Sequence, residues 1–107
     1  IMKQKMFTAA QYKKLVDNFN KQEGGTKDFK VVVKLFNPAG LGTWYLSELN
    51  PETNEAFGLA DLHEKELGYV SIDELKNLKL PMGLKIERDF SFPENKISFD
   101  ELMKEAA

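Results

Sequence analysis

Residues 43–62 read TWYLSELNPETNEAFGLADL, and this stretch decides the fold. Two runs rich in aromatic and aliphatic residues, Thr43–Leu49 and Ala56–Leu62, flank a turn at Asn50–Asn54 that contains a proline. Short apolar runs joined by such a turn are typical of a β-hairpin. The sequence therefore predicts two adjacent antiparallel strands.

Simple pairing across this turn also predicts a register. It sets Leu46 beside Leu59 on a shared core face, with Val33 of the preceding strand on the other side of Leu46. In the same register Glu48 pairs near Phe57.

The segments on either side of the hairpin add further strands. Phe29–Phe36 alternates apolar and basic residues as a half-buried strand does, and Asn37–Gly42 is turn chemistry. Tyr69 and Val70 are expected to form a short strand, and Leu84–Phe92 the last one. The last strand is expected to place four apolar residues on one face: Leu84, Ile86, Phe90 and Phe92.

Three helix starts carry the same capping signature, a hydroxyl residue followed three positions later by Glu or Gln. The pairs are Thr8 and Gln11, Ser71 and Glu74, and Ser98 and Glu101. The expected helices are Ala9–Gln22, Ile72–Leu78 and Phe99–Ala106. Together with the strands they predict an α+β fold: an antiparallel sheet of four to five strands, an N-terminal helix, a short middle helix and a C-terminal helix.

Composition limits the class of protein. The 107 residues, 42% of them apolar, suit one domain over residues 1–107, in which residues 1–6 are expected to be flexible. There is no cysteine, and a formal charge of −2 lacks the basic balance usual in duplex-binding domains. No apolar run is long enough to span a bilayer, so we expect a cytoplasmic protein with no membrane partner.

Polar residues on apolar strand faces are the first candidates for a binding site. Arg88 lies between Ile86 and Phe90, while Glu48 and Asp61 continue the apolar faces of their strands. An unpaired buried charge is too costly to persist, so each of the three must reach solvent or a partner. The hairpin register keeps Glu48 and Asp61 about 13 Å apart. Arg88 can therefore meet only one of them, and a structural ion pair of Arg88 is favoured over a ligand-binding arginine.

Two aromatic residues suggest a second kind of site. Trp44 and Tyr45 are expected near Lys30 and Lys34, and a sheet that exposes aromatic rings beside lysines can stack unpaired bases. Strand alternation sends the two rings to opposite faces. Core packing is favoured over nucleic-acid binding, which stays an alternative.

Metal-dependent hydrolysis is a further alternative. Asp61 and His63 have a spacing seen in metal ligands, and Glu87 and Asp89 add carboxylates. His63 is the only histidine, and Glu64-Lys65-Glu66 beside it is interpreted as an exposed loop. We expect no metal and no cofactor.

Five blocks resemble a known family. They are KLFNP (34–38), GTWYLSEL (42–49), AFGLADL (56–62), ELGYVS (66–71) and GLKIERD (83–89). In this order they resemble a family of small bacterial proteins of unknown function carried on plasmids, conjugative elements and phages, with residues 31–92 as the family-like region. The resemblance implies a small cytoplasmic accessory protein of mobile elements.

These observations favour a non-catalytic module that binds another protein. Its contact surface is expected to be a sheet face or the Asn37–Gly42 loop, with Trp44, Tyr45, Glu48, Asp61 and Arg88 as candidate binding residues. A metal-dependent hydrolase or nucleic-acid-processing accessory, and a single-stranded nucleic-acid-binding domain, are the alternatives. The sequence leaves the oligomeric state open.

Overall fold

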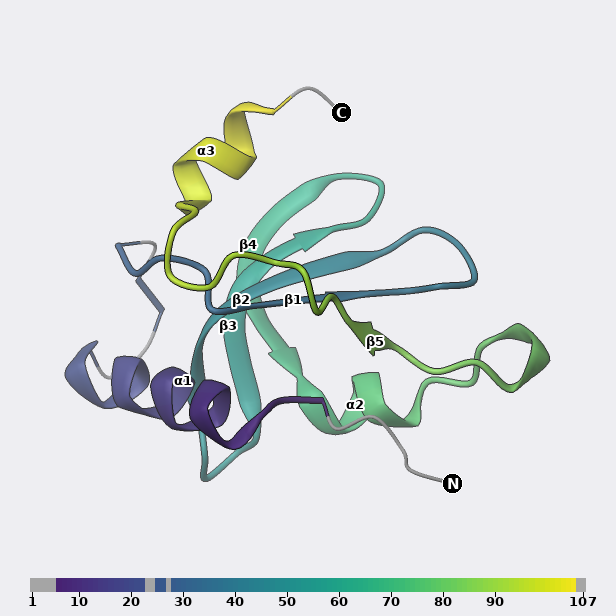
Figure 1. The fold of residues 1–107 in the computed structure, drawn as a ribbon, viewed down its shortest axis with the longest axis horizontal. Helices are drawn as coiled ribbons and strands as arrows, with labels where there is room; N and C mark the ends of the chain where they lie inside the picture. The colour runs from purple at the N-terminus through teal and green to yellow at the C-terminus, as the bar shows by residue number, and fades with distance from the viewer. Residues whose placement is uncertain (1–5, 23–24, 27, 106–107) are drawn as a thin grey trace.

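The computed structural model describes residues 6–22, 25–26 and 28–105, and it has the predicted α+β architecture (Figure 1). A five-stranded antiparallel sheet has the order β4-β3-β2-β1-β5. The strands are β1 (Val33–Phe36), β2 (Thr43–Asn50), β3 (Glu55–Asp61), β4 (Lys65–Ser71) and β5 (Glu87–Arg88). The helices are α1 (Ala9–Gln22), α2 (Ile72–Asn77) and α3 (Phe99–Lys104), with a 3-10 turn η1 at Pro81–Gly83. The flexibility expected for residues 1–6 falls, apart from residue 6, outside the described residues.

The three predicted helix starts are confirmed. The Thr8 hydroxyl accepts the N–H of Gln11 at 3.1 Å, and the Gln11 side chain accepts the N–H of Thr8 at 2.9 Å. Ser98 and Glu101 form the same reciprocal box, and Ser71 accepts the N–H of Glu74. These bonds satisfy backbone donors that a helix leaves unpaired at its start.

The sheet is covered on both faces. On the first face, Leu15 of α1 and Ile72 and Leu75 of α2 pack on strand residues such as Leu35 and Leu46. On the second face, Phe99 and Leu102 of α3 pack on Val31, Phe57 and Leu59. Lys65 at the start of β4 donates to the carbonyls of Leu102 and Glu105, at 2.7 and 2.8 Å, and so ties the end of α3 to the sheet. Positive charge at a helix C-terminus complements the helix dipole.

A β-bulge at Ser47 changes the predicted register. Val33 pairs with Leu46 and Glu48 pairs with Phe57, as predicted. The pairing of Leu46 with Leu59 is wrong, because Leu46 faces Gly58 and Leu59 faces Tyr45. The bulge adds one residue to β2, and a shift of one residue moves a side chain to the opposite face. Leu59 therefore belongs to the core of the second face.

Three other strand predictions are also wrong in extent. The strand expected at Phe29–Phe36 begins only at Val33, because the backbone of Val31 bonds to Asn95 and Ile97 and not to a strand of the sheet. β4 is seven residues long and includes Lys65 and Glu66, which were expected in a loop, because it pairs with β3 along the whole of that strand. β5 has only two residues. The Asp89 carboxylate accepts the N–H of Ser91 at 2.9 Å and closes a turn there, so the strand cannot continue.

This turn takes the chain from one face of the sheet to the other. Ile86, which precedes the turn, is buried in the core of the first face. Phe92, which follows the turn, packs against the core of the second face. Phe90 between them is 77% exposed, so these residues do not share the single face expected for them. Figure 1 shows this segment leaving β5 and running on to α3. None of the helices in the described part of the chain has the length and apolar character needed to cross a membrane.

Candidate functional site

Glu48 is a fully buried carboxylate on the second face. Its oxygens accept the backbone N–H groups of Gly25 at 3.2 Å and Thr26 at 2.9 Å. Burial raises the pKa of the Glu48 carboxyl, and the two N–H donors offset part of that rise by favouring the charged form. Glu48 thus holds the chain that follows α1 against the sheet.

Asp61 and Arg88 lie on opposite faces of the sheet. Asp61 pairs with Thr43 and Lys65, in the row of residues that faces α3. Arg88 pairs with Leu35, whose side chain belongs to the first core. The guanidinium of Arg88 lies 5.0 Å from the ring centre of Phe90, a cation–π distance. The register also places Glu48 several residues from Asp61, so the structure does not bring the three predicted polar residues together.

Trp44 and Tyr45 lie on opposite faces, as alternation predicted. Trp44 is 7% exposed and belongs to the first core. Tyr45 is half-buried on the second face, where its ring centre lies 6.0 Å from that of Phe92. Burial raises the pKa of the Tyr45 hydroxyl, and the negative charges of Asp61, Glu105 and Asp89 raise it further.

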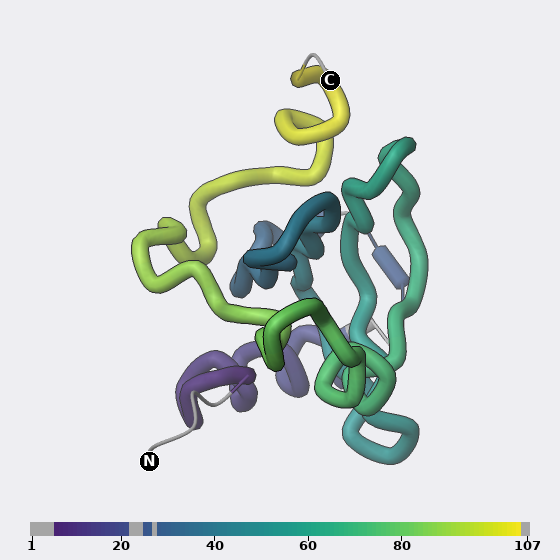
Figure 2. The backbone as a smooth tube through the Cα atoms, turned by 90° about the vertical axis from the view of Figure 1, so that its right-hand side faces the viewer, coloured from purple at the N-terminus to yellow at the C-terminus, as the bar shows by residue number. Residues whose placement is uncertain are grey.

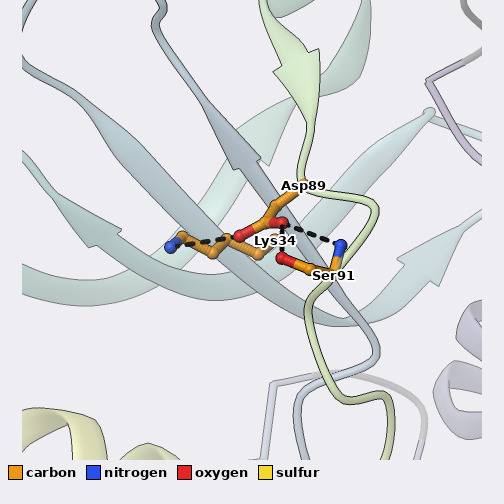
Figure 3. A network of polar contacts seen from close by, with 3 residues as sticks. All are labelled: Lys34, Asp89 and Ser91. Carbon is orange, nitrogen blue, oxygen red and sulfur yellow. Dashed lines mark hydrogen bonds and ion pairs between the residues drawn. The ribbon is translucent and has the colours of Figure 1, made fainter.

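The ammonium group of Lys34 contacts both the Tyr45 ring and the Asp89 carboxylate. Its Nζ lies 5.8 Å from the Tyr45 ring centre and 3.4 Å from Asp89 Oδ2. Asp89 Oδ1 accepts the N–H and the hydroxyl of Ser91 (Figure 3). The Ser91 hydrogen bonds and, after them, Lys34 lower the pKa of the Asp89 carboxyl. This network fixes the turn by which the chain leaves β5.

The residues considered for metal-dependent chemistry are spread over the sheet. His63 is exposed in the turn between β3 and β4. Glu87 pairs with Phe36, so β1 and β2 lie between it and Asp61, a separation of about 14 Å at the usual strand spacing. The described residues contain no group of three or more His, Cys, Asp or Glu side chains placed to hold a metal ion.

Sequence reasoning missed the free edge of β4. The N–H of Ile72 donates to the carbonyl of Asn54, and the N–H of Leu62 to the carbonyl of Glu64, which fixes the alternation of the β3–β4 ladder. Residues of β4 therefore bond alternately to β3 and outward, and the backbone groups of Glu66, Gly68 and Val70 are the ones that bond to β3. The peptide groups of Leu67 and Tyr69 therefore point away from the sheet.

This edge is open and apolar. No backbone hydrogen bond joins it to another segment in the part of the chain that the structure describes. The side chains of Leu67 and Tyr69 are 37% and 48% exposed. Figure 2 shows β4 at the right-hand border of the molecule, away from α1. The only signal for this edge in the sequence was the short uncharged run Leu67–Val70.

A cavity of about 90 Å³ lies beside the same strand on the first face. The paired glycines Gly58 and Gly68 form its floor. Trp44 and Leu46 of β2 line it on one side, and β4 lines it on the other. A cavity of this size holds at least one water molecule or a small aliphatic side chain.

The fold and the candidate site together define a small α+β domain, a sheet covered on both faces with a free edge at β4. The chain belongs to the family described as "Protein of unknown function (DUF2958)", which matches residues 6–106. No curated protein and no solved structure matches the chain.

Proposed function

We propose that this protein is a non-catalytic module that binds another protein, and that it does so by adding a strand of the partner to β4. One observation carries the proposal: β4 is a seven-residue edge strand with outward peptide groups and two exposed apolar side chains. An extended peptide paired to such an edge gains main-chain hydrogen bonds, and the side chains around it give selectivity.

The absence of protection along this edge supports the proposal. Proteins commonly block a free edge with lysines, prolines or bulges, because an open edge invites pairing with other chains. Residues 67–70 of β4 contain no charge and no proline, and the ladder to β3 is regular. Lys65, the lysine on this strand, is engaged with the last carbonyls of α3. An edge kept open in this way suits a binding surface.

The alternative functions have less support from the contacts. Stacking of bases on Trp44 requires the first core to open, because this ring is buried there. Lys34 is already paired with Asp89 on the second face. Of the carboxylates considered for hydrolysis, Asp61 on β3 is separated by two strands from Glu87 of β5 and from Asp89, which follows β5.

The setting of this interaction is also a proposal. The resemblance of the central blocks to proteins of mobile elements supports an accessory role in the bacterial cytoplasm for plasmids, conjugative elements or phages. The partner is then a protein of the same element or of its host.

Affinity capture with an edge-blocked variant tests the proposal. Leu67→Pro removes an outward N–H and leaves the bonds to β3 intact, a position at which edge strands accept proline. Leu67→Val keeps the N–H and an apolar side chain and serves as the matched control. Circular dichroism and thermal unfolding verify that both variants fold.

Tagged wild type and Leu67→Val are expected to recover the same stoichiometric protein from host lysate, with or without nuclease, and Leu67→Pro is expected to lose it. Equal recovery by Leu67→Pro would exclude the edge as the contact. Recovery of nuclease-sensitive material alone would point to nucleic acid instead.

A further inference from the structure

We propose that the cavity over Gly68 is a selectivity pocket that receives an apolar side chain of the added strand, followed two positions later by a basic residue beside Glu66. This inference rests on the proposed function and names the chemistry of the partner segment. Its occupant is an extended segment of a different protein.

The two glycines of the pocket floor are there for different reasons. A Cβ on Gly58 would lie 2.8 Å from the carbonyl carbon of Tyr45, so the bulged strand requires glycine at that position. A Cβ on Gly68 would meet no atom within 4 Å. Glycine in the interior of a strand weakens it, and it often marks a site where another backbone or a ligand approaches. The fold itself does not require glycine at residue 68, whereas an open pocket does.

Strand geometry directs one residue of an added strand to this pocket. If the new strand runs antiparallel to β4, it bonds to the outward groups of Leu67 and Tyr69, and one of its residues lies opposite Gly68 in a non-hydrogen-bonded pair. Side chains approach most closely in such pairs. This residue points to the first face, over the glycine and toward Trp44 and Leu46, which line the cavity. The lining favours an aliphatic side chain.

The neighbouring positions on the same face set the rest of the pattern. The next residue of the added strand on this face lies opposite Glu66, whose exposed side chain stands at the rim of the pocket. The residue on the other side lies opposite Val70. Cross-strand pairs favour opposite charges and apolar matches. In the direction of the added strand, the expected pattern is apolar-x-apolar-x-Lys/Arg.

A second copy of this chain fits the pocket poorly. In a two-fold pairing centred on Gly68, glycine faces glycine and both pockets stay empty. Centring on Leu67 places Glu66 of the second copy over the pocket. Centring on Tyr69 brings Val70 there, but β4 ends at Ser71 and α2 begins at Ile72, so the added strand stops before it reaches Glu66. A longer segment from another protein meets all three positions.

The test uses a phage-displayed library of random ten-residue peptides, selected on the full chain. Enriched peptides are synthesised and titrated into wild type, Gly68→Val and Leu67→Pro, with chemical shifts of the β4 amides as the readout. Lys13→Ala is the control, because the Lys13 side chain is 77% exposed on α1, away from β4 (Figure 2). Thermal unfolding verifies that Gly68→Val folds as well as wild type.

Enriched peptides are expected to show the apolar-x-apolar-x-basic pattern and to shift the amides of residues 65–71. Gly68→Val is expected to weaken binding at least about tenfold, as when an aliphatic side chain loses its pocket. Leu67→Pro is expected to abolish binding, and Lys13→Ala to leave it unchanged.

The outcomes separate the pocket from the edge. Equal binding by wild type and Gly68→Val, with loss in Leu67→Pro, would overturn the pocket and leave strand addition standing. Binding that survives Leu67→Pro would overturn both. Enrichment without the pattern, or a wild-type dimer that excludes peptide in sedimentation experiments, would overturn the inference about the partner.

Discussion

The carboxylate of Glu48 accepts the N–H of Thr26 at 2.9 Å, and this bond joins the bulged part of β2 to the chain that has just left α1. Glu48 itself is buried and pairs with Phe57, whose ring meets that of Tyr69 edge to face. A sheet strand and the exit of a helix are therefore held together by one acid.

Removal of this acid is expected to destabilise the fold. Glu48→Ala leaves two backbone donors without their acceptor, at a cost of about 1–3 kcal/mol of unfolding free energy. Denaturant unfolding measures the effect. Glu66→Gln, an exposed change on β4, is the control and is expected to stay within about 0.5 kcal/mol of wild type. Equal stability of the two variants would show that the bonds of Glu48 contribute little.

The same carboxyl is expected to make stability depend on pH. Burial raises its pKa above the ordinary 4.5, so the folded state binds the proton more readily than the unfolded state. The contribution of Glu48 to the free energy of unfolding therefore falls as pH rises from 4.5 through the raised pKa, and is constant above it.

Comparison with Glu48→Gln isolates this effect, because glutamine does not titrate. The difference in unfolding free energy, wild type minus variant, is expected to be largest at pH 4.5 and below. A difference that grows with rising pH would contradict the raised pKa.

The glycines of the β3–β4 pair are expected to respond in opposite ways. Gly58→Ala forces a Cβ against the Tyr45 peptide and is expected to cost several kcal/mol, since backbone must move. Gly68→Ala places its Cβ in open space and adds β propensity, so its stability is expected to equal or exceed that of wild type. Thermal unfolding of the two alanine variants makes the comparison directly. Similar losses of stability in both variants would show that the whole β3–β4 pairing, and not the contact between residue 58 and Tyr45, requires glycine.

The contact of α1 with the bulge gives a further prediction. Asn18 Nδ2 donates to the Ser47 carbonyl at 2.9 Å, while Asn18 Oδ1 and Ser47 Oγ, both buried, have no hydrogen-bond partner within the part of the chain that the structure describes. Ser47→Ala removes an unsatisfied hydroxyl and is expected to be neutral or stabilising by up to about 1 kcal/mol.

Asn18→Ala, in contrast, removes a made hydrogen bond and is expected to cost about 1–3 kcal/mol. Both variants are measured by denaturant unfolding at one pH. A large loss in Ser47→Ala would indicate a water that serves the hydroxyl.

Local signals in the sequence predicted the helix starts and the β2–β3 hairpin of the sheet. Thr8, Ser71 and Ser98 act on backbone groups within three residues, so the sequence at those positions contains the whole interaction. The pairing of Glu48 with Phe57 is also near a turn and was predictable. The helix starts and the α+β class follow from such short-range patterns. The helix ends do not: α2 ends at Asn77 and α3 at Lys104, before the predicted ends Leu78 and Ala106.

The features that sequence reasoning missed depend on contacts between distant segments. The bulge at Ser47 has no mark in the residue pattern, yet it moves Leu59 to the other face. β4 gains its length from pairing with β3, and β5 loses its length to the turn at Asp89. The donors for Glu48 come from residues 25 and 26, beyond α1. The candidate edge at Leu67 and Tyr69 follows from sheet order, which periodicity alone does not give.

The segment after β5 has a consequence for how the chain folds. Val31 exchanges backbone hydrogen bonds with Asn95 and Ile97, and the Gln11 side chain donates to the Glu94 carboxylate. Residues near the N-terminus therefore make these bonds only after the C-terminal part of the chain has reached them. Contacts between such distant parts of a chain slow folding, because long loops must close before the contacts form. During synthesis, Phe57 and Leu59 are expected to lack the cover of Phe99 and Leu102 until those residues have been made. A chaperone that shields this face during translation is therefore expected to raise the yield of folded protein.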